Sequence, residues 1–149
     1  MGKIDYKSAG VNIDAGNEAV NRIKDGVKST FTSNVLTGIG SFGSLYDLKP
    51  ILENYDNPVM VQSIDGVGTK TIIARKLGKF DTIGIDLLSA AANDILVMGA
   101  RPLTFLDYIA NDKLNPKTIE KIVSGMVKAC KSTGVSLVGG ETAEMPNIY

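Results

Sequence analysis

Apolar residues recur every three or four positions along three stretches of the chain, which is the spacing of one face of a helix. The pattern predicts helices over residues 12–27, 86–98 and 116–133. Asn115 followed by a proline is typical of a helix start, and Gly134 is typical of a helix end. The third helix therefore has both of its ends marked in the sequence.

The apolar positions of these helices predict the core. Asp14 is the expected N-cap of the first helix. The residues expected to face the core are Val20, Ile23, Val27, Leu88, Ala91, Ile95, Met98, Ile119, Ile122, Val123, Met126, Val127 and Cys130. The opposite face of the second helix carries Asp86, Ala90, Asn93 and Asp94 instead of the usual lysines and glutamates. We expect a ligand or another subunit to cover that face, with plain exposure to solvent as the alternative.

Short β-branched and aromatic runs predict four strands, at Val59–Ile64, Thr82–Ile85, Leu103–Ile109 and Val135–Val138. A short helix is expected over Thr69–Leu77. Strands that alternate with helices predict an α/β fold, with a four-stranded sheet flanked by helices. So small a sheet leaves one face that needs a partner for cover.

Length and composition restrict the possible functions. The 149 residues fit one domain, and 16 basic residues balance 16 acidic ones, so no overall charge favours nucleic acid or acidic membranes. The chain has no histidine, which excludes histidine-based catalytic triads and zinc sites with histidine ligands. No stretch reaches the ~20 apolar residues of a membrane span. With a single cysteine and no signal-peptide pattern at the start, we expect a cytoplasmic protein.

Two glycine-rich segments are candidates for phosphate binding. Gly38–Gly43 has the G-x-G-x-x-G spacing, but no strand precedes it, so a loop over phosphates is favoured over a dinucleotide fingerprint. Asp65–Lys70 (DGVGTK) follows a predicted strand and opens a predicted helix. Backbone amides at a helix start suit phosphate oxygens, and an aspartate at the end of a strand suits magnesium. An ordinary strand–turn–helix connection is the alternative.

Carboxylates recur where predicted strands end. Asp65 and Glu141 follow two such strands, and the second helix presents Asp86 and Asp94. The carboxyl ends of strands meet at the ligand crevice of an α/β sheet, so we expect these groups to converge. Mg²⁺ takes a few carboxylates together with phosphate oxygens and water. The residues therefore predict a Mg²⁺–ATP site, and a general base is the less favoured interpretation.

The same segments resemble the aminoimidazole ribonucleotide synthetases, the cyclo-ligases of purine biosynthesis, over essentially the whole chain. The matching stretches are Tyr6–Asn17, Asp65–Lys70, Asp81–Leu87, Asn93-Asp94, Gly99–Pro102, Phe105–Tyr108 and Leu137–Pro146. The strand-end carboxylates and the turn at Gly99–Pro102 (GARP) also occur in a wider superfamily that includes thiamine-monophosphate kinase. AGVNIDAGN and GGETAEMP narrow the resemblance to the cyclo-ligases.

The resemblance implies a homodimer in which two four-stranded sheets close an eight-stranded barrel, with ATP near the interface. It implies that ATP phosphorylates the formyl amide oxygen of formylglycinamidine ribonucleotide. An internal nitrogen then attacks, which releases ADP and phosphate and forms aminoimidazole ribonucleotide. Residues 1–149 would be the ATP-binding and dimerisation domain, with the C-terminal domain absent from this chain.

The resemblance also assigns roles to residues of this sequence. Asp65 and Asp94 are the first choices for magnesium, followed by Glu141 and Asp86, and Asp65, Asp94 and Lys70 are the candidate catalytic residues. The expected ATP contacts are Lys24, Gly66, Val67, Gly68, Thr69, Lys70, Asn93, Gly139, Gly140, Glu141 and Thr142. Another ATP-dependent enzyme of the superfamily, or a non-catalytic dimerising module when the domain is isolated, remain the alternatives.

Overall fold

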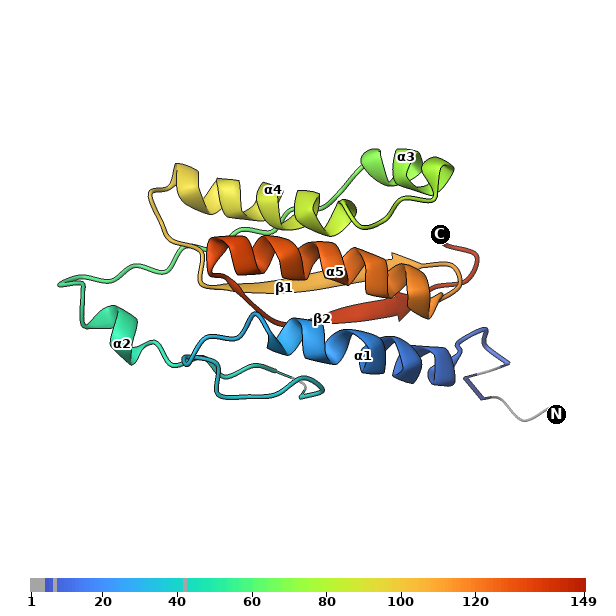
Figure 1. The fold of residues 1–149 in the computed structure, drawn as a ribbon, viewed down its shortest axis with the longest axis horizontal. Coiled ribbons are helices and arrows are strands. Elements are labelled where there is room, and N and C mark those ends of the chain that lie inside the picture. The colour runs from blue at the N-terminus through green and yellow to red at the C-terminus, as the bar shows by residue number, and fades with distance from the viewer. Residues whose placement is uncertain (1–4, 7, 42) are drawn as a thin grey trace.

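The computed structural model describes residues 5–6, 8–41 and 43–149 and has an α/β fold (Figure 1). Lys7 and Phe42, which belong to two of the segments discussed above, lie outside the described residues. The elements are α1 (Ile13–Lys28), α2 (Lys49–Leu52), α3 (Lys70–Leu77), α4 (Ile83–Val97), β1 (Thr104–Asn111), α5 (Pro116–Thr133) and β2 (Ser136–Glu144).

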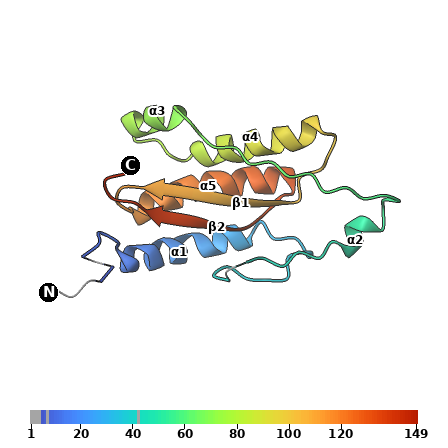
Figure 2. The same cartoon turned by 180° about the vertical axis from the view of Figure 1, so that it is seen from behind.

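Strands β1 and β2 form a parallel sheet, and helix α5 is the crossover between them. The pairing runs from Thr104 opposite Ser136 to Asn111 opposite Glu144, with a register shift after Phe105. Helices α1 and α5 lie on one face of the sheet, and Figure 2 shows the strands from the other face. Both strands run in the same direction, so their carboxyl ends meet at one end of the molecule.

The core lies where α5 packs between the sheet and its neighbouring helices. Ile119 and Met126 of α5 are at most 1% exposed, and they pack in one cluster with Val27 of α1 and Leu137 of β2. The predicted helix ends of α5 are confirmed. Asn115 accepts a hydrogen bond from the Thr118 N–H, and Gly134 adopts the left-handed conformation with φ 72°.

Helices α4 and α5 cross closely because glycine lies at the contact. A Cβ atom on Gly84 would meet the backbone of Ile122 and Met126, and one on Gly125 would meet the backbone oxygen of Asp81. Any larger residue would force the helix axes apart. This crossing explains why the expected strand at Thr82–Ile85 is wrong: Gly84 and Leu88 continue one helical face against α5.

The other expected strands have mixed outcomes. β1 and β2 confirm the strands at Leu103–Ile109 and Val135–Val138, and both are longer than predicted. Residues 59–64 are extended but belong to no strand, and the described residues offer their N–H groups no backbone acceptor. The described part of the chain therefore has a two-stranded sheet where the sequence predicted four strands.

The expected helices are confirmed, with three corrections. Helix α4 begins at Ile83 rather than Asp86, and α1 is capped by Asn12, whose side chain accepts a hydrogen bond from the Ala15 N–H. Val20 and Met98 were expected in the core but are 46% and 70% exposed. Ala19 takes the buried place on α1, and α4 ends before Met98 can turn inward. Among the described residues, no helix is long and apolar enough to cross a membrane.

Candidate functional site

The extended segment of residues 57–68 runs beside helix α4 (Figure 2). Ser63 donates a hydrogen bond from Oγ to Asp94 Oδ2 at 2.8 Å. This bond places two of the expected magnesium ligands on neighbouring elements, because Asp65 follows two residues later in the segment. The Asp65 carboxylate is exposed and accepts the Gly66 N–H at 2.6 Å.

Helix α3 begins directly after the DGVGT segment. Its first residue, Lys70, forms an ion pair with Asp86 of α4, with Nζ 3.0 Å from Oδ1. The N–H groups of Gly68 and Thr69 have no backbone acceptor among the described residues, as expected for groups that precede a helix. The structure therefore brings a lysine, free amides and a carboxylate together at the start of α3.

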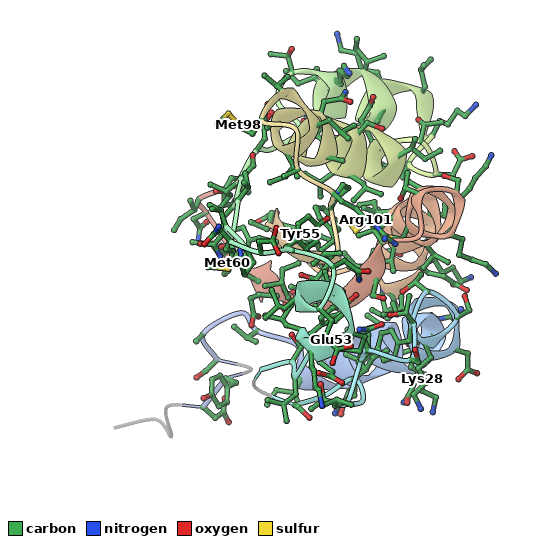
Figure 3. The ribbon with its side chains drawn as sticks, turned by 90° about the vertical axis from the view of Figure 1, so that its left-hand side faces the viewer. Lys28, Glu53, Tyr55, Met60, Met98 and Arg101 are labelled. Carbon is green, nitrogen blue, oxygen red and sulfur yellow. The ribbon has the colours of Figure 1, made fainter. Side chains whose placement is uncertain are left out.

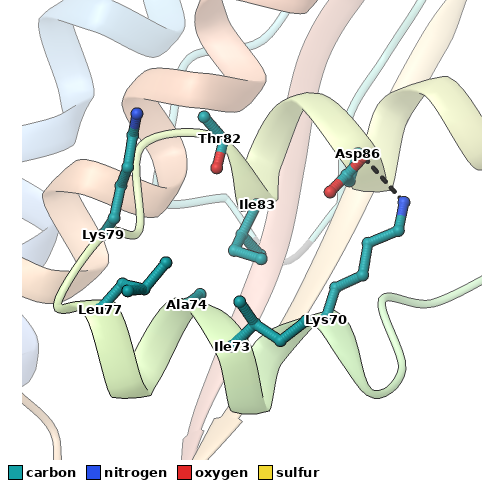
Figure 4. A pocket seen from close by; sticks show the side chains of 8 residues that line it. All are labelled: Lys70, Ile73, Ala74, Leu77, Lys79, Thr82, Ile83 and Asp86. Atoms are coloured by element: carbon teal, nitrogen blue, oxygen red, sulfur yellow. Dashed lines mark hydrogen bonds and ion pairs between the residues drawn. The ribbon is translucent and has the colours of Figure 1, made fainter.

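A groove of about 240 Å³ lies between α3 and α4 (Figure 4). Lys70 and Asp86 meet at one end of it, and Lys79 lies at the other end. Between them the walls are mainly apolar, with Ile73 and Ile83 facing each other. The groove therefore combines mainly apolar walls with charged groups at its ends.

A second hollow, of about 560 Å³, lies beyond the end of α4 and includes Arg101 of the GARP turn. Its other walls are small or apolar residues, among them Leu96 and Pro102. Figure 3 shows Arg101 near the end of α5, whereas Met98 and Met60 point outward at the opposite margin. Lys70 and Asp86 line the groove between α3 and α4 instead, so the two hollows share no candidate ligand group.

Asp107 is an acidic residue with a raised pKa, beside Glu141, that the sequence reasoning did not select, although it lies in the matching stretch Phe105–Tyr108. It lies on β1 opposite Gly140 of β2, and its carboxylate fills the space that a Cβ atom on Gly140 would need. Burial, and secondarily the negative charge of Glu141, raise the pKa of Asp107 to about 6. Its place between Phe105 and Ile109 on the core-facing side of a strand was the signal available in the sequence.

Glu141 itself is exposed on β2, opposite Tyr108. At the preceding residue, Gly140, a Cβ atom would meet the side chain of Asp107. Three residues later, Glu144 accepts the backbone N–H groups of Asn12 at 2.6 Å and Leu114 at 2.8 Å. These two bonds hold the pKa of Glu144 below its usual value and tie the end of β2 to the starts of α1 and α5.

The remaining candidates lie apart from these groups. Lys24 is exposed on α1 and has no hydrogen bond or ion pair with another candidate in the described part of the chain. The described residues of Gly38–Gly43 form the tip of a hairpin-like loop that is closed by a bridge between Val35 and Tyr46. Asn93 is exposed beside Asp94 on α4.

The carboxylates do not converge as fully as expected. Within the described residues, no three acidic or cysteine side chains come close enough to hold a metal ion. Asp86 is engaged by Lys70 and Asp94 by Ser63. Mg²⁺ held largely by nucleotide phosphates and water needs only one or two protein carboxylates, so Asp65 and Asp94 fit that smaller role.

Comparison with known proteins gives one family. Residues 49–149 match the N-terminal domain of the AIR synthase related proteins. The chain is 54% identical over 149 residues to a phosphoribosylformylglycinamidine cyclo-ligase of Carboxydothermus hydrogenoformans, and 53% identical over 144 residues to one of Brevibacillus brevis. These alignments cover 100% and 97% of this chain but 43% and 41% of the relatives, so the chain spans about two fifths of their length.

Among solved structures, the chain is similar to a thiamine-monophosphate kinase from Stenotrophomonas maltophilia. The TM-score is 0.67 at 21% sequence identity, and the match covers 84% of this chain and 38% of the kinase chain. At that identity the likeness concerns the fold alone. It supports the α/β fold described above.

Proposed function

The chain belongs to the AIR synthase related proteins, as an example of their N-terminal domain, and on that premise we propose that it supplies the ATP-binding part of a phosphoribosylformylglycinamidine cyclo-ligase. The observation that carries the proposal is identity of about one half along the entire chain to relatives of that name. The reaction of the whole enzyme would be ATP-dependent closure of an imidazole ring on formylglycinamidine ribonucleotide. The expected C-terminal domain would complete the substrate site.

The start of α3 is the proposed phosphate site. Lys70 can exchange its contact with Asp86 for a phosphate oxygen, because both side chains are solvent-accessible. The N–H groups of Gly68 and Thr69, which have no backbone acceptor among the described residues, lie at the start of helix α3, where anions are favoured. We propose that Val67 and Gly66 complete this turn around the nucleotide.

The proposed metal ligands are Asp65 and Asp94, with Glu141 and Asp86 as further candidates. Bound Mg²⁺ would neutralise charge on the transferring phosphate. Ser63 holds the Asp94 carboxylate toward the segment that carries Asp65, which keeps the two groups on adjacent elements. We place Lys24, Asn93, Gly139, Gly140 and Thr142 as additional nucleotide contacts because they match the family's motifs.

The test is a calorimetric titration of this chain with Mg²⁺–ATP, repeated with ATP and EDTA. We expect heat of binding that EDTA removes. Asp65→Asn and Asp94→Asn should each weaken binding by about tenfold or more, since each removes a charged ligand. Asp25→Asn, an exposed carboxylate on α1, is the matched control and should bind as the parent does. Binding that both site variants retain in full would refute the metal assignment.

We also propose that the chain forms a homodimer through its sheet. Val59, Met60 and Ile64 of the extended segment are 85%, 77% and 97% exposed, and Leu106 and Tyr108 of β1 are 64% and 59% exposed. An apolar segment with unpaired backbone is a template for strand pairing with another chain. Sedimentation equilibrium should give twice the chain mass, and monomer alone at high concentration would contradict the proposal.

A further inference from the structure

Two buried polar residues join segments that are far apart in the sequence. Thr30 follows helix α1 and Ser136 begins β2, and their side chains are 6% and 0% exposed. They are the buried polar residues of the described chain. A hydroxyl group placed in a core costs free energy unless it is hydrogen-bonded. The hydrogen bonds of these two hydroxyls therefore show which segments they hold together.

Each hydroxyl donates one hydrogen bond and accepts another. Ser136 Oγ donates to the Thr30 carbonyl at 3.1 Å and accepts the Thr32 N–H at 3.2 Å. Thr30 Oγ1 donates to the Val27 carbonyl at 2.7 Å and accepts the Leu137 N–H at 3.0 Å. We call this set of four bonds the Thr30–Ser136 latch. Three of the four bonds join the chain that leaves α1 to the first two residues of β2, and the fourth holds Thr30 to the last turn of α1.

The latch lies at the root of a loop that the sequence singles out. Two residues beyond Thr32, the chain enters a hairpin stem of residues 34–37 and 44–47. The two sides of the stem are joined by hydrogen bonds from the Leu36 N–H to the Leu45 carbonyl at 2.9 Å and from the Asp47 N–H to the Asn34 carbonyl at 2.8 Å. The stem carries the glycine-rich loop. The latch joins the root of this stem to the rest of the molecule, and Ile39 of the loop also packs against the core.

The latch also lies just upstream of the second glycine segment. Leu137, which it holds, comes two residues before Gly139 and four before Glu141 on β2. β2 pairs with β1 from Ser136 to Glu144, with a register shift directly after Leu137. The two glycine segments that the proposed function assigns to the nucleotide thus share one anchor.

We propose that Thr30 and Ser136 are positioning residues, which fix the hairpin of residues 34–47 relative to β2. For its link to ATP the inference rests on the proposed function. For the anchoring itself it rests only on the four bonds. Neither side chain is exposed enough to touch a ligand, so both act through the segments that they hold.

Hydrogen exchange of the folded chain tests the anchoring. In Ser136→Ala we expect the stem amides of Leu36 and Asp47 to exchange about tenfold faster or more, because a buried partner is lost at the root. Amides in the middle of α5, such as that of Met126, should change less. Ser132→Ala, which removes a hydroxyl bonded only to a carbonyl within α5, is the control and should leave the stem unchanged.

Two variants at Thr30 separate the hydroxyl from its volume. Thr30→Val keeps the shape and loses Oγ1, and it should speed exchange in the stem as Ser136→Ala does. Thr30→Ser keeps the hydroxyl and should restore slow exchange. Stem amides that stay protected in both Ser136→Ala and Thr30→Val, or that accelerate only in step with α5, would overturn the inference.

The same variants distinguish this inference from the proposed function. If the chain binds Mg²⁺–ATP, Ser136→Ala should lower the affinity several-fold while Ser132→Ala leaves it unchanged, and equal affinities would overturn the positioning role. If the parent chain binds no ATP, the proposed function fails. The exchange results then still decide whether the latch anchors the hairpin.

Discussion

The two sides of α4 differ sharply in how well they are packed. On one side, α5 contributes six buried residues to the core: Ile119, Val123, Gly125, Met126, Ala129 and Cys130. On the other side, α3 buries only Ala74, and the extended segment of residues 57–68 buries none. The first side has the composition and burial of a stable scaffold. The second presents Ile73, Leu77 and Ile64 to solvent, at 59%, 72% and 97% exposure.

The candidate ligand groups lie on the thinly packed side. Asp65 and Lys70 come from the extended segment and the start of α3, and Asp86 and Asp94 come from the face of α4 turned toward them. Regions with few buried apolar contacts open most readily, which suits a site that must admit a nucleotide. The comparison separates residues that hold the fold from residues that we propose to do chemistry.

Truncation in the scaffold gives the largest expected effect. Met126→Ala should lower the free energy of unfolding by about 2–5 kcal/mol, because a fully buried side chain leaves a cavity. Met98→Ala is the matched control: the same change at a side chain 70% exposed should cost no more than about 0.5 kcal/mol. Urea denaturation measures both values. Equal losses would erase the proposed difference between the two sides.

Asp107 is an exception within the scaffold, since its carboxylate is partly buried there and forms no ion pair with a cation among the described residues. Its pKa is raised from an ordinary value near 4 to about 6, so the folded state disfavours the charged form. The penalty is absent below about pH 4 and complete above about pH 6. Asp107→Asn should therefore raise the free energy of unfolding at pH 7, by at most about 3 kcal/mol.

The pH dependence is the sharper part of that prediction. The gain from Asp107→Asn should shrink as the pH falls from 6 to 4, when the native carboxylate becomes protonated. Asp25→Asn on the exposed side of α1 should show no comparable gain at either pH. Denaturation curves at pH 4 and pH 7 give all four values. A gain that does not depend on pH would show that burial of the charge is not its cause.

The helices whose limits depend on local periodicity and capping residues could be predicted from the sequence. The helix from Pro116 was correct at both ends because Asn115 and Gly134 are capping residues whose effect is local. Three of the four residues of Thr82–Ile85 are β-branched, which favours a strand on local grounds. Only the contact of Gly84 with the backbone of α5 shows that the segment is helical, and that contact spans some forty residues of sequence.

The placement of the candidate site residues could be anticipated only in part, and their roles stay predictions. Motif spacing selected Lys70 and Asp86, which the structure joins at 3.0 Å. Motif spacing did not select Asp107. Its partly buried position depends on Gly140 of the neighbouring strand, which leaves room for the carboxylate, and the sequence does not show that these two residues are neighbours. Convergence of the acidic groups was expected from strand ends, but Asp86 and Asp94 lie on a helix whose contacts are with Lys70 and Ser63.

The smallest effect on stability is expected at the ion pair between Lys70 and Asp86, on the thinly packed side of α4. Lys70→Ala should change the free energy of unfolding by less than about 1 kcal/mol, because the two side chains are 66% and 38% exposed and solvent screens their attraction. On the proposed function, the same change should weaken Mg²⁺–ATP binding by about tenfold or more. Lys79→Ala, at the other end of the groove, removes an equal charge and should affect neither quantity comparably. If Lys70→Ala instead costs several kcal/mol of stability, α3 is part of the scaffold, and the contrast between the two sides of α4 fails. If Lys79→Ala weakens ATP binding as much as Lys70→Ala does, the groove acts through its net charge rather than through Lys70.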